Sequence, residues 1–318
     1  MDKDKKNNWK AWLYLAPVLI LMAIFTFFPI VSTIISSFLK DYNNVTGESA
    51  GFSFYNYAYL FGLAEKYEGT GVYFTEFFSL KPGTHSAFWN TMFITFVTVP
   101  ISVVLALVIS LAIHSIKPLK KFFQTVFFMP YVTNVIAVGM VFALLFNQNG
   151  VWNRIFRLTI NWLAPNFATW GSAMFVLCLY IIWTALPYKI LIFLSGLEGI
   201  DRQYYDAARI DGVGKVRTAW KITVPLLSPQ ILYITVTSFI TAFKEYGSVV
   251  GLLNRSYSSN PAKNDMYTVV YWIYDQMKKA QWNTTSQIAS AAAVILLVVI
   301  LLFTLLELWI SKKKVVYR

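Results

Sequence analysis

The segment Gly212-Val213-Gly214-Lys215 contains the residue types that end a phosphate-binding loop, in which backbone N–H groups and a lysine hold the phosphates of a nucleotide. The complete pattern requires a glycine five residues before Gly214, and Arg209 occupies that position. No strand pattern precedes the segment either. We therefore interpret it as a turn between two short helices, and we expect no nucleotide site in this chain.

Other catalytic and metal-binding patterns are missing from the sequence. Its His, Cys, Asp and Glu residues do not cluster with the spacing of metal ligands, and no Ser-His-Asp set is recognisable. Cys178 is the only cysteine, which excludes a disulfide framework and a thiolate metal site. We therefore predict no catalytic residues, no metal and no cofactor bound by this chain.

Two charged residues, Lys244 and Glu245, lie inside an otherwise apolar stretch. Each charge costs roughly 2.5–3.5 kcal/mol at the centre of a lipid-exposed helix, so both should face a polar cavity or another helix. Tyr246 follows them and adds an aromatic ring to the polar groups. We expect a polar cavity here, with Asn134, Tyr180 and Trp183 as further candidates for its wall.

The composition requires a membrane. Of the 318 residues, 57% are hydrophobic and 13% are charged, whereas an average soluble domain has about 25% charged residues. Six apolar stretches are long enough to cross about 30 Å of hydrocarbon as helices. They cover residues 11–39, 88–113, 122–146, 170–191, 230–250 and 288–310. We predict an all-α integral membrane protein in which residues 1–318 form a single transmembrane domain of six helices.

The basic residues predict how the chain is oriented. The net charge is +12, but Lys and Arg gather between the apolar stretches rather than along one face, which argues against nucleic acid as a partner. One alternating set of segments, including the one with Lys189, carries seventeen of them and the other carries eight. The richer set should be cytoplasmic. Both termini then lie inside the cell, and residues 41–87 form an extracytoplasmic segment.

The segment 151–163 has apolar and basic residues at roughly helical spacing, with Trp152 and Trp162 suited to a membrane interface. We expect a short helix lying on the outer surface there.

The polar segment 198–221 is the most organised part between the predicted spans. Asp201 can cap a helix that begins near residue 202, and Gly212 or Gly214 can end that helix with a positive φ. Pro225 and Pro229 mark the entry into the next span. This helix–turn–helix pattern predicts a segment that contacts another molecule in the cytoplasm.

The same residues carry a resemblance to a known family. The sequence of Asp206-Ala207-Ala208, Asp211-Gly212, and Ile222 to Leu227 with Pro225 resembles the loop that marks the membrane subunits of binding-protein-dependent ABC importers. Phe27-Phe28-Pro29, Phe88-Trp89-Asn90-Thr91 and Tyr271-Trp272-Ile273-Tyr274 are similar to the sugar-permease branch. The first acidic position is Asp206, where the family usually has Glu.

The resemblance implies the fold of a type I ABC importer permease, with a cytoplasmic coupling loop over residues 198–229. It implies that Asp206, Ala207, Ala208, Asp211, Gly212 and Pro225 dock onto one of two partner ATPase subunits, which bind ATP and Mg²⁺ themselves. The other implied partners are a second, related permease subunit in a heterodimer, an extracytoplasmic solute-binding protein and the lipid bilayer. The location implied is a bacterial inner membrane, crossed several times.

The function implied is ATP-driven import of a sugar, specifically an oligosaccharide, by alternating access. Aromatic and polar groups together suit a sugar, so the resemblance makes the polar cavity the expected substrate pathway, with the candidates Lys244, Glu245, Tyr246, Asn134, Tyr180 and Trp183. A salt bridge from Lys244 or Glu245 to the partner subunit is the alternative, and a pathway containing Lys244 would favour an anionic saccharide. A permease for a non-sugar solute such as glycerol phosphate or a polyamine is the first alternative. A stand-alone secondary transporter or a membrane scaffold is an alternative of another class. A secondary transporter predicts inverted repeats and broken helices in both halves, and the sequence shows neither.

Overall fold

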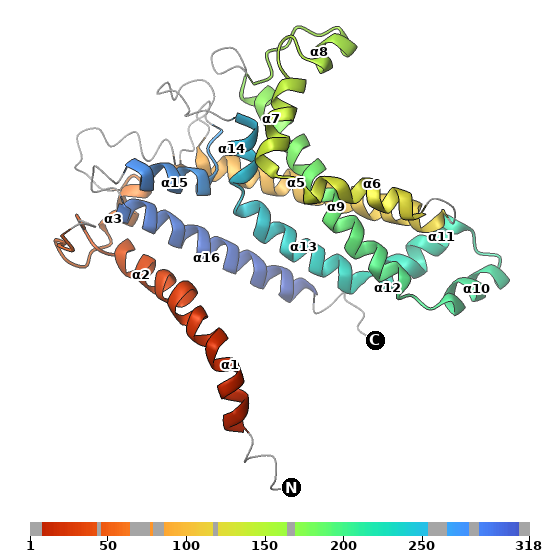
Figure 1. Cartoon of the computed structure of the whole chain (residues 1–318), viewed down its shortest axis with the longest axis horizontal. Helices are drawn as coiled ribbons and strands as arrows, with labels where there is room; N and C mark the ends of the chain where they lie inside the picture. Colours follow the sequence, from red (N-terminus) through yellow and green to blue (C-terminus); the bar gives the residue numbers. More distant parts are fainter. Residues whose placement is uncertain are drawn as a thin grey trace. The chain divides into compact units, whose positions relative to one another are not determined.

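A computed structural model describes residues 8–42, 46–63, 77–78, 86–116, 120–163, 169–253, 266–279 and 286–311 (Figure 1). The described residues contain helices and one isolated bridge, and no strand. The chain divides into two compact units, Met1–Gly71 with Ile273–Leu297 and Val72–Trp272 with Val298–Arg318. Helices α15 (Val269–Lys279) and α16 (Ser286–Ser311) each contribute to both units.

The first unit begins with a long apolar helix. Its parts are α1 (Asn8–Met22), a π-helical turn (Ala23–Phe27) and α2 (Phe28–Ser37), which follow one another without a break. The short helix α3 (Tyr55–Leu60) is tied to the end of α2 by polar contacts. The Asn56 Nδ2 group donates to the carbonyls of Ser37 and Leu39, both at 2.9 Å, and these bonds satisfy carbonyls at the helix terminus.

The second unit is built around two helices of 29 residues each, α5 (Ala87–Ser115) and α9 (Trp170–Glu198), which pack against each other. Helix α6 (Lys120–Val132) packs on α9, and α13 (Ser228–Phe243) packs on α5. Apolar side chains form two clusters along α9, one around Leu177 and one around Phe193. Because apolar residues surround α5 and α9, both can be buried against protein on one side and lipid on another.

Three chain breaks interrupt the remaining helices of this unit. Helix α7 (Val135–Leu145) follows α6 after a bend of 99°. The stretch containing α11 (Lys215–Thr218) and α12 (Val224–Leu226) meets α13 at a bend of 68°. Helix α14 (Gly247–Leu253) follows α13 after three non-helical residues. Breaks of this kind are tolerated at membrane depth where protein or a cavity satisfies the freed backbone groups.

Helices α7 and α14 touch through glycines. A Cβ atom added to Gly139 would lie 2.5 Å from the carbonyl carbon of Gly251. Only glycine permits this approach, because any side chain there would overlap the facing backbone. The two half-helices that follow the breaks are therefore packed tightly against each other.

The observed helices can be compared with the predicted spans. Four unbroken stretches are long and apolar enough to cross a membrane: Trp12–Ser37, Ala87–Ser115, Trp170–Glu198 and Ser286–Ser311. Two bent pairs raise the number to six if each pair counts as one span. The mostly helical architecture with multiple apolar spans is confirmed. Much of the predicted extracytoplasmic segment 41–87 lies outside the described residues, as do Lys312, Lys313, Lys314 and Arg318.

Two predictions about individual residues were wrong. Lys189 was counted with an inner segment although it falls within the predicted span 170–191; it lies inside α9, which continues to Glu198, and it is buried. The expected surface helix over 151–163 is limited to α8 (Val151–Phe156). Trp162 is buried, and its Nε1 donates to Asn153 Oδ1 at 2.7 Å. An internal hydrogen bond thus takes the place of the interfacial contact that a Trp in such a sequence usually makes.

Candidate functional site

A cavity of about 550 Å³ lies within the second unit. Its walls come from α5, α9 and α13 and from the two breaks between α6 and α7 and between α13 and α14. The lining includes the hydroxyl-bearing residues Thr98, Ser102, Tyr131, Thr133, Thr184, Tyr188, Thr237, Ser238, Thr241 and Ser248. Several of these hydroxyls, such as those of Thr184, Thr237 and Thr241, donate to backbone carbonyls, and their oxygens can still accept hydrogen bonds from a polar solute.

Lys189 brings a positive charge to this cavity. Its side chain is 5% exposed, and its Nζ donates to Ser102 Oγ at 2.5 Å. Ser102 Oγ in turn donates to the carbonyl of Val99 at 3.0 Å. The serine proton is therefore directed at Val99, which leaves the oxygen lone pairs for the lysine. This chain of bonds fixes the ammonium group between α9 and α5.

Glu245 brings a negative charge from the break between α13 and α14. Its Oε1 accepts from Ser248 N at 2.9 Å, which satisfies a backbone donor in the first turn of α14. Its backbone carbonyl accepts from Thr268 Oγ1 at 2.6 Å. Glu245 thus stabilises the break and also contributes a carboxylate to the wall of the cavity.

Aromatic rings cover another part of the wall. Tyr131 of α6 and Tyr188 of α9 both line the cavity, with their rings stacked at 5.9 Å between centroids. The hydroxyl of Tyr188 lies 2.9 Å from the hydroxyl of Tyr233 on α13. The stacked rings offer a flat apolar face beside hydroxyl groups, and that combination suits the faces of a sugar ring.

The structure places the six pathway candidates differently. Glu245 lines the cavity, whereas Lys244 is exposed at the end of α13. Tyr246 stacks on Tyr271, and Trp183 packs its ring 5.3 Å from Phe142. The remaining two have hydrogen-bonding roles: the buried Tyr180 donates to the carbonyl of Val135, and Asn134 Oδ1 caps α7 by accepting from Ile136 N at 2.8 Å.

Sequence reasoning passed over Lys189, Ser102, Tyr131 and Tyr188. A signal existed for Lys189, since it falls inside the predicted span 170–191, where the argument applied to Lys244 holds equally. No comparable signal existed for Ser102 or the tyrosines, because their place in the cavity depends on how α5, α6 and α9 pack.

The predicted coupling loop forms a second candidate site. It contains α10 (Arg202–Ile210) and α11, joined by a turn. The expected cap is confirmed, since Asp201 Oδ1 accepts from Gln203 N at 3.0 Å. The expected positive φ is confirmed at Gly212, where φ is +69°. Each feature stops the chain from continuing as one helix, so the loop folds into two short helices.

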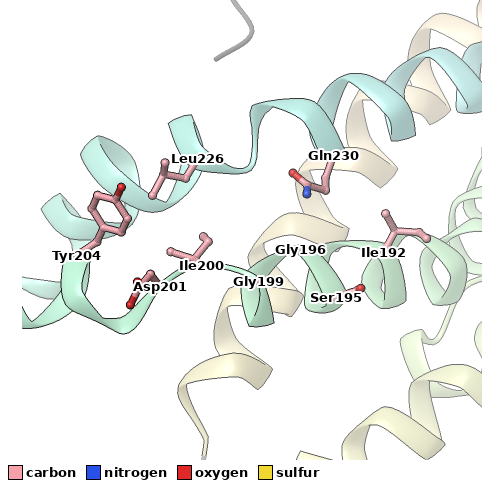
Figure 2. A pocket seen from close by; sticks show the side chains of 9 residues that line it. All are labelled: Ile192, Ser195, Gly196, Gly199, Ile200, Asp201, Tyr204, Leu226 and Gln230. Atoms are coloured by element: carbon pink, nitrogen blue, oxygen red, sulfur yellow. The ribbon is translucent and has the colours of Figure 1, made fainter. Parts of the chain in front are cut away.

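The loop joins the spans at a small pocket of about 270 Å³. Figure 2 shows the end of α9 facing the stretch from α12 to α13, with Leu226 and Gln230 directed toward α9. A Cβ added to Gly196 would lie 2.9 Å from Gln230 Cγ, so the two helices are in close contact here. Residues of α9 and α13 also line the larger cavity, so the loop is connected to that cavity through both helices.

The proposed docking residues lie mostly on the surface of the loop. Asp206 and Arg209 are both exposed, with 4.0 Å between Asp206 Oδ1 and Arg209 Nη1. Ala207, Asp211, Gly212 and Pro225 are exposed, whereas Ala208 is buried. The loop also exposes three apolar side chains that sequence reasoning did not select: Ile210, 87% exposed, with Val216 and Trp220. Exposed apolar groups among charges are typical of a protein contact surface.

A model of the family described as "binding-protein-dependent transport system inner membrane component" matches residues 99–316. The lactose transport system permease protein LacF of Rhizobium radiobacter is 28% identical over 275 residues, covering 83% of this chain and 82% of LacF. The arabinooligosaccharides transport system permease protein AraP of Bacillus subtilis (strain 168) is 26% identical over 288 residues, covering 86% and 82%.

The fold is similar to that of a chain in the crystal structure of a bacterial alginate ABC transporter in complex with an alginate pentasaccharide-bound periplasmic protein. The TM-score is 0.74 at 20% identity, over 98% of this chain and 96% of the other. This likeness establishes the fold of an ABC importer permease for the present chain.

Proposed function

We propose that this chain, which belongs to the family of binding-protein-dependent transport system inner membrane components, carries a saccharide across the membrane. The observation that carries the proposal is the cavity lined by hydroxyls and by the stacked rings of Tyr131 and Tyr188. Sugar rings offer hydroxyls at their edges and C–H groups on their faces, and the two parts of this wall complement them. The similarity to LacF, a lactose transport permease, and to AraP, an arabinooligosaccharide transport permease, supports the same substrate class.

The chain is a multi-pass inner membrane protein and a transport component rather than an enzyme. The energy would therefore come from separate ATPase subunits, which supply the ATP and Mg²⁺ sites. A second related permease would complete the pathway, and a solute-binding protein would deliver the saccharide from outside. With both termini cytoplasmic, the coupling loop faces the ATPases.

The coupling loop is the part of the chain that would dock onto an ATPase. The docking residues would be Asp206, Ala207, Ala208, Asp211, Gly212 and Pro225, to which we add the exposed Ile210. The loop connects α9 and α13, and cavity-lining residues lie on both helices. Rigid helices transmit displacement along their axes, so closure of the ATPases would change the shape of the cavity and alternate its access.

The pathway candidates then divide into two groups. Glu245 would contact the saccharide directly, together with the newly identified Tyr131 and Tyr188. Asn134, Tyr180, Trp183 and Tyr246 would support the wall through the caps and stacking contacts described above, and Lys244 would lie beside the break. The stand-alone secondary transporter, the scaffold and the non-sugar permease are not favoured by the family and its named sugar-transport members.

The test is ATPase activity of the purified complex in proteoliposomes, measured with its binding protein and a panel of solutes. The panel contains neutral and acidic oligosaccharides, glycerol 3-phosphate and putrescine. We expect at least one oligosaccharide to stimulate ATP hydrolysis and to accumulate inside the vesicles. Stimulation by glycerol 3-phosphate or putrescine alone would contradict the saccharide assignment.

A further inference from the structure

The surroundings of Lys189 differ from those of an ordinary buried lysine. Within the described part of the chain, no carboxylate oxygen lies within 4.0 Å of its Nζ, and Ser102 is its hydrogen-bonding partner. Buried charges in proteins are normally paired with an opposite charge. The ammonium group has three protons to donate, so one bond to Ser102 leaves capacity for an acceptor that enters the cavity.

Glu245 does not supply this missing charge. Its carboxylate accepts from Ser248 N in the first turn of α14, and within the described residues no ion pair joins it to Lys189. Lys189 lies on α9, nine residues before the end of that helix that leads to the coupling loop.

The two charges are held on different parts of the cavity wall. A negative group placed at Lys189 would meet the ammonium group between α5 and α9, whereas the Glu245 carboxylate is held at the break between α13 and α14. It would also lie beside Tyr188, the neighbour of Lys189 in α9, whose ring belongs to the aromatic wall. A sugar ring stacked on that wall would thus bring a substituent on its edge within reach of the ammonium group.

We propose that Lys189 and Ser102 form an anion subsite that binds the carboxylate or phosphate ester of an acidic saccharide. Lys189 donates to the anionic oxygens, and Ser102 holds the ammonium in place through its bond to Val99. The inference rests on the proposed function, since it assigns a charge class to the saccharide. In this inference, Lys189 is the residue that selects acidic over neutral sugars.

The experiment measures binding to the intact complex in nanodiscs by equilibrium dialysis, without the binding protein, so that the selectivity of the permease alone is observed. The probes are matched pairs: trigalacturonate with galactotriose, trimannuronate with mannotriose, and glucose 6-phosphate with glucose. For at least one pair, we expect the wild type to bind the acidic member on the order of tenfold more tightly, because charge-assisted hydrogen bonds are stronger than neutral ones. The uronate and phosphate pairs distinguish the two sources of the anion.

Variants test the residue itself. Lys189→Gln should reduce the affinity for the acidic member on the order of tenfold and leave the neutral member within about twofold. Lys189→Arg keeps the charge and should retain the preference. Lys10→Gln removes an exposed lysine on α1 and should change neither affinity. Binding of the neutral member reports, within the same sample, that the Lys189→Gln complex is folded.

Three results would overturn the inference. Equal affinities of the wild type for both members of every pair would show that the cavity does not discriminate between acidic and neutral sugars. If Lys189→Gln lowered the affinities for the acidic and the neutral member equally, and Lys189→Arg restored both affinities, the lysine would have a structural role. Either result leaves saccharide transport intact as a function. If no saccharide of any pair binds and none stimulates ATP hydrolysis, the proposed function fails, and the anion subsite fails with it.

Discussion

The turn at Gly212 offers a sharp test of the coupling loop, because a neighbouring glycine provides a matched control. Gly212 has a φ of +69°, whereas Gly214 has φ and ψ of −67° and 153°, which any residue adopts. A Cβ added to either glycine would meet no atom within 4 Å. Substitution therefore introduces backbone strain at Gly212 alone, and steric overlap at neither position.

The strain can be converted into an expected effect. An L-residue in the left-handed region costs roughly 1–2 kcal/mol, and a β-branched residue is a strong outlier there. One to two kcal/mol corresponds to a change of about 5- to 30-fold in the population of the observed turn. If the turn positions the docking surface, Gly212→Val should lower the solute transported per ATP hydrolysed by about that factor. Gly212→Asn should have a smaller effect, since Asn tolerates positive φ.

The assay compares both quantities in proteoliposomes: accumulation of labelled saccharide and release of phosphate. Gly214→Val should leave the transport ratio close to that of the wild type. The reasoning is refuted if Gly212→Val transports with an unchanged ratio, or if Gly214→Val lowers the ratio equally. In the second case, the length or chemistry of the turn would matter rather than its handedness.

Three further changes test the packing and the surface. Gly139→Ala should lower the melting temperature of the complex, because overpacking costs about 1–3 kcal/mol. Gly171→Ala is the control and should leave the melting temperature unchanged, because no atom lies near the added Cβ. Asn90→Ala should destabilise the complex by about 1–3 kcal/mol, because Asn90 accepts from the Trp170 indole at 2.9 Å and donates to the Tyr267 carbonyl at 3.0 Å. Denaturant unfolding measures this loss of stability. Ile210→Glu should reduce the amount of ATPase subunit that copurifies with the complex, whereas Ile155→Glu on α8 should not. Equal amounts of ATPase in the two variants would show that Ile210 is not part of the docking surface.

Local sequence signals sufficed for several parts of this protein. The apolar stretches predicted where membrane-spanning helices lie, because the length and hydropathy of a span depend on consecutive residues. Asp201 predicted the start of α10, and Gly212 was one of two glycines predicted to end it, because a cap and a left-handed turn each depend on one residue type at one position. The loop pattern around Asp206 also identified the family before the fold was known.

The cavity, by contrast, was decided by the tertiary structure. Its walls combine residues from α5, α6, α9 and α13, and no local pattern specifies how those helices pack or where two of the spans break. Packing separated Glu245, which lines the cavity, from its exposed neighbour Lys244. It also brought Lys189 next to Ser102, which is 87 residues away in the sequence. A lysine in an apolar span indicates that a polar partner exists, but only the folded chain identifies that partner, because the contact is made between helices rather than along one.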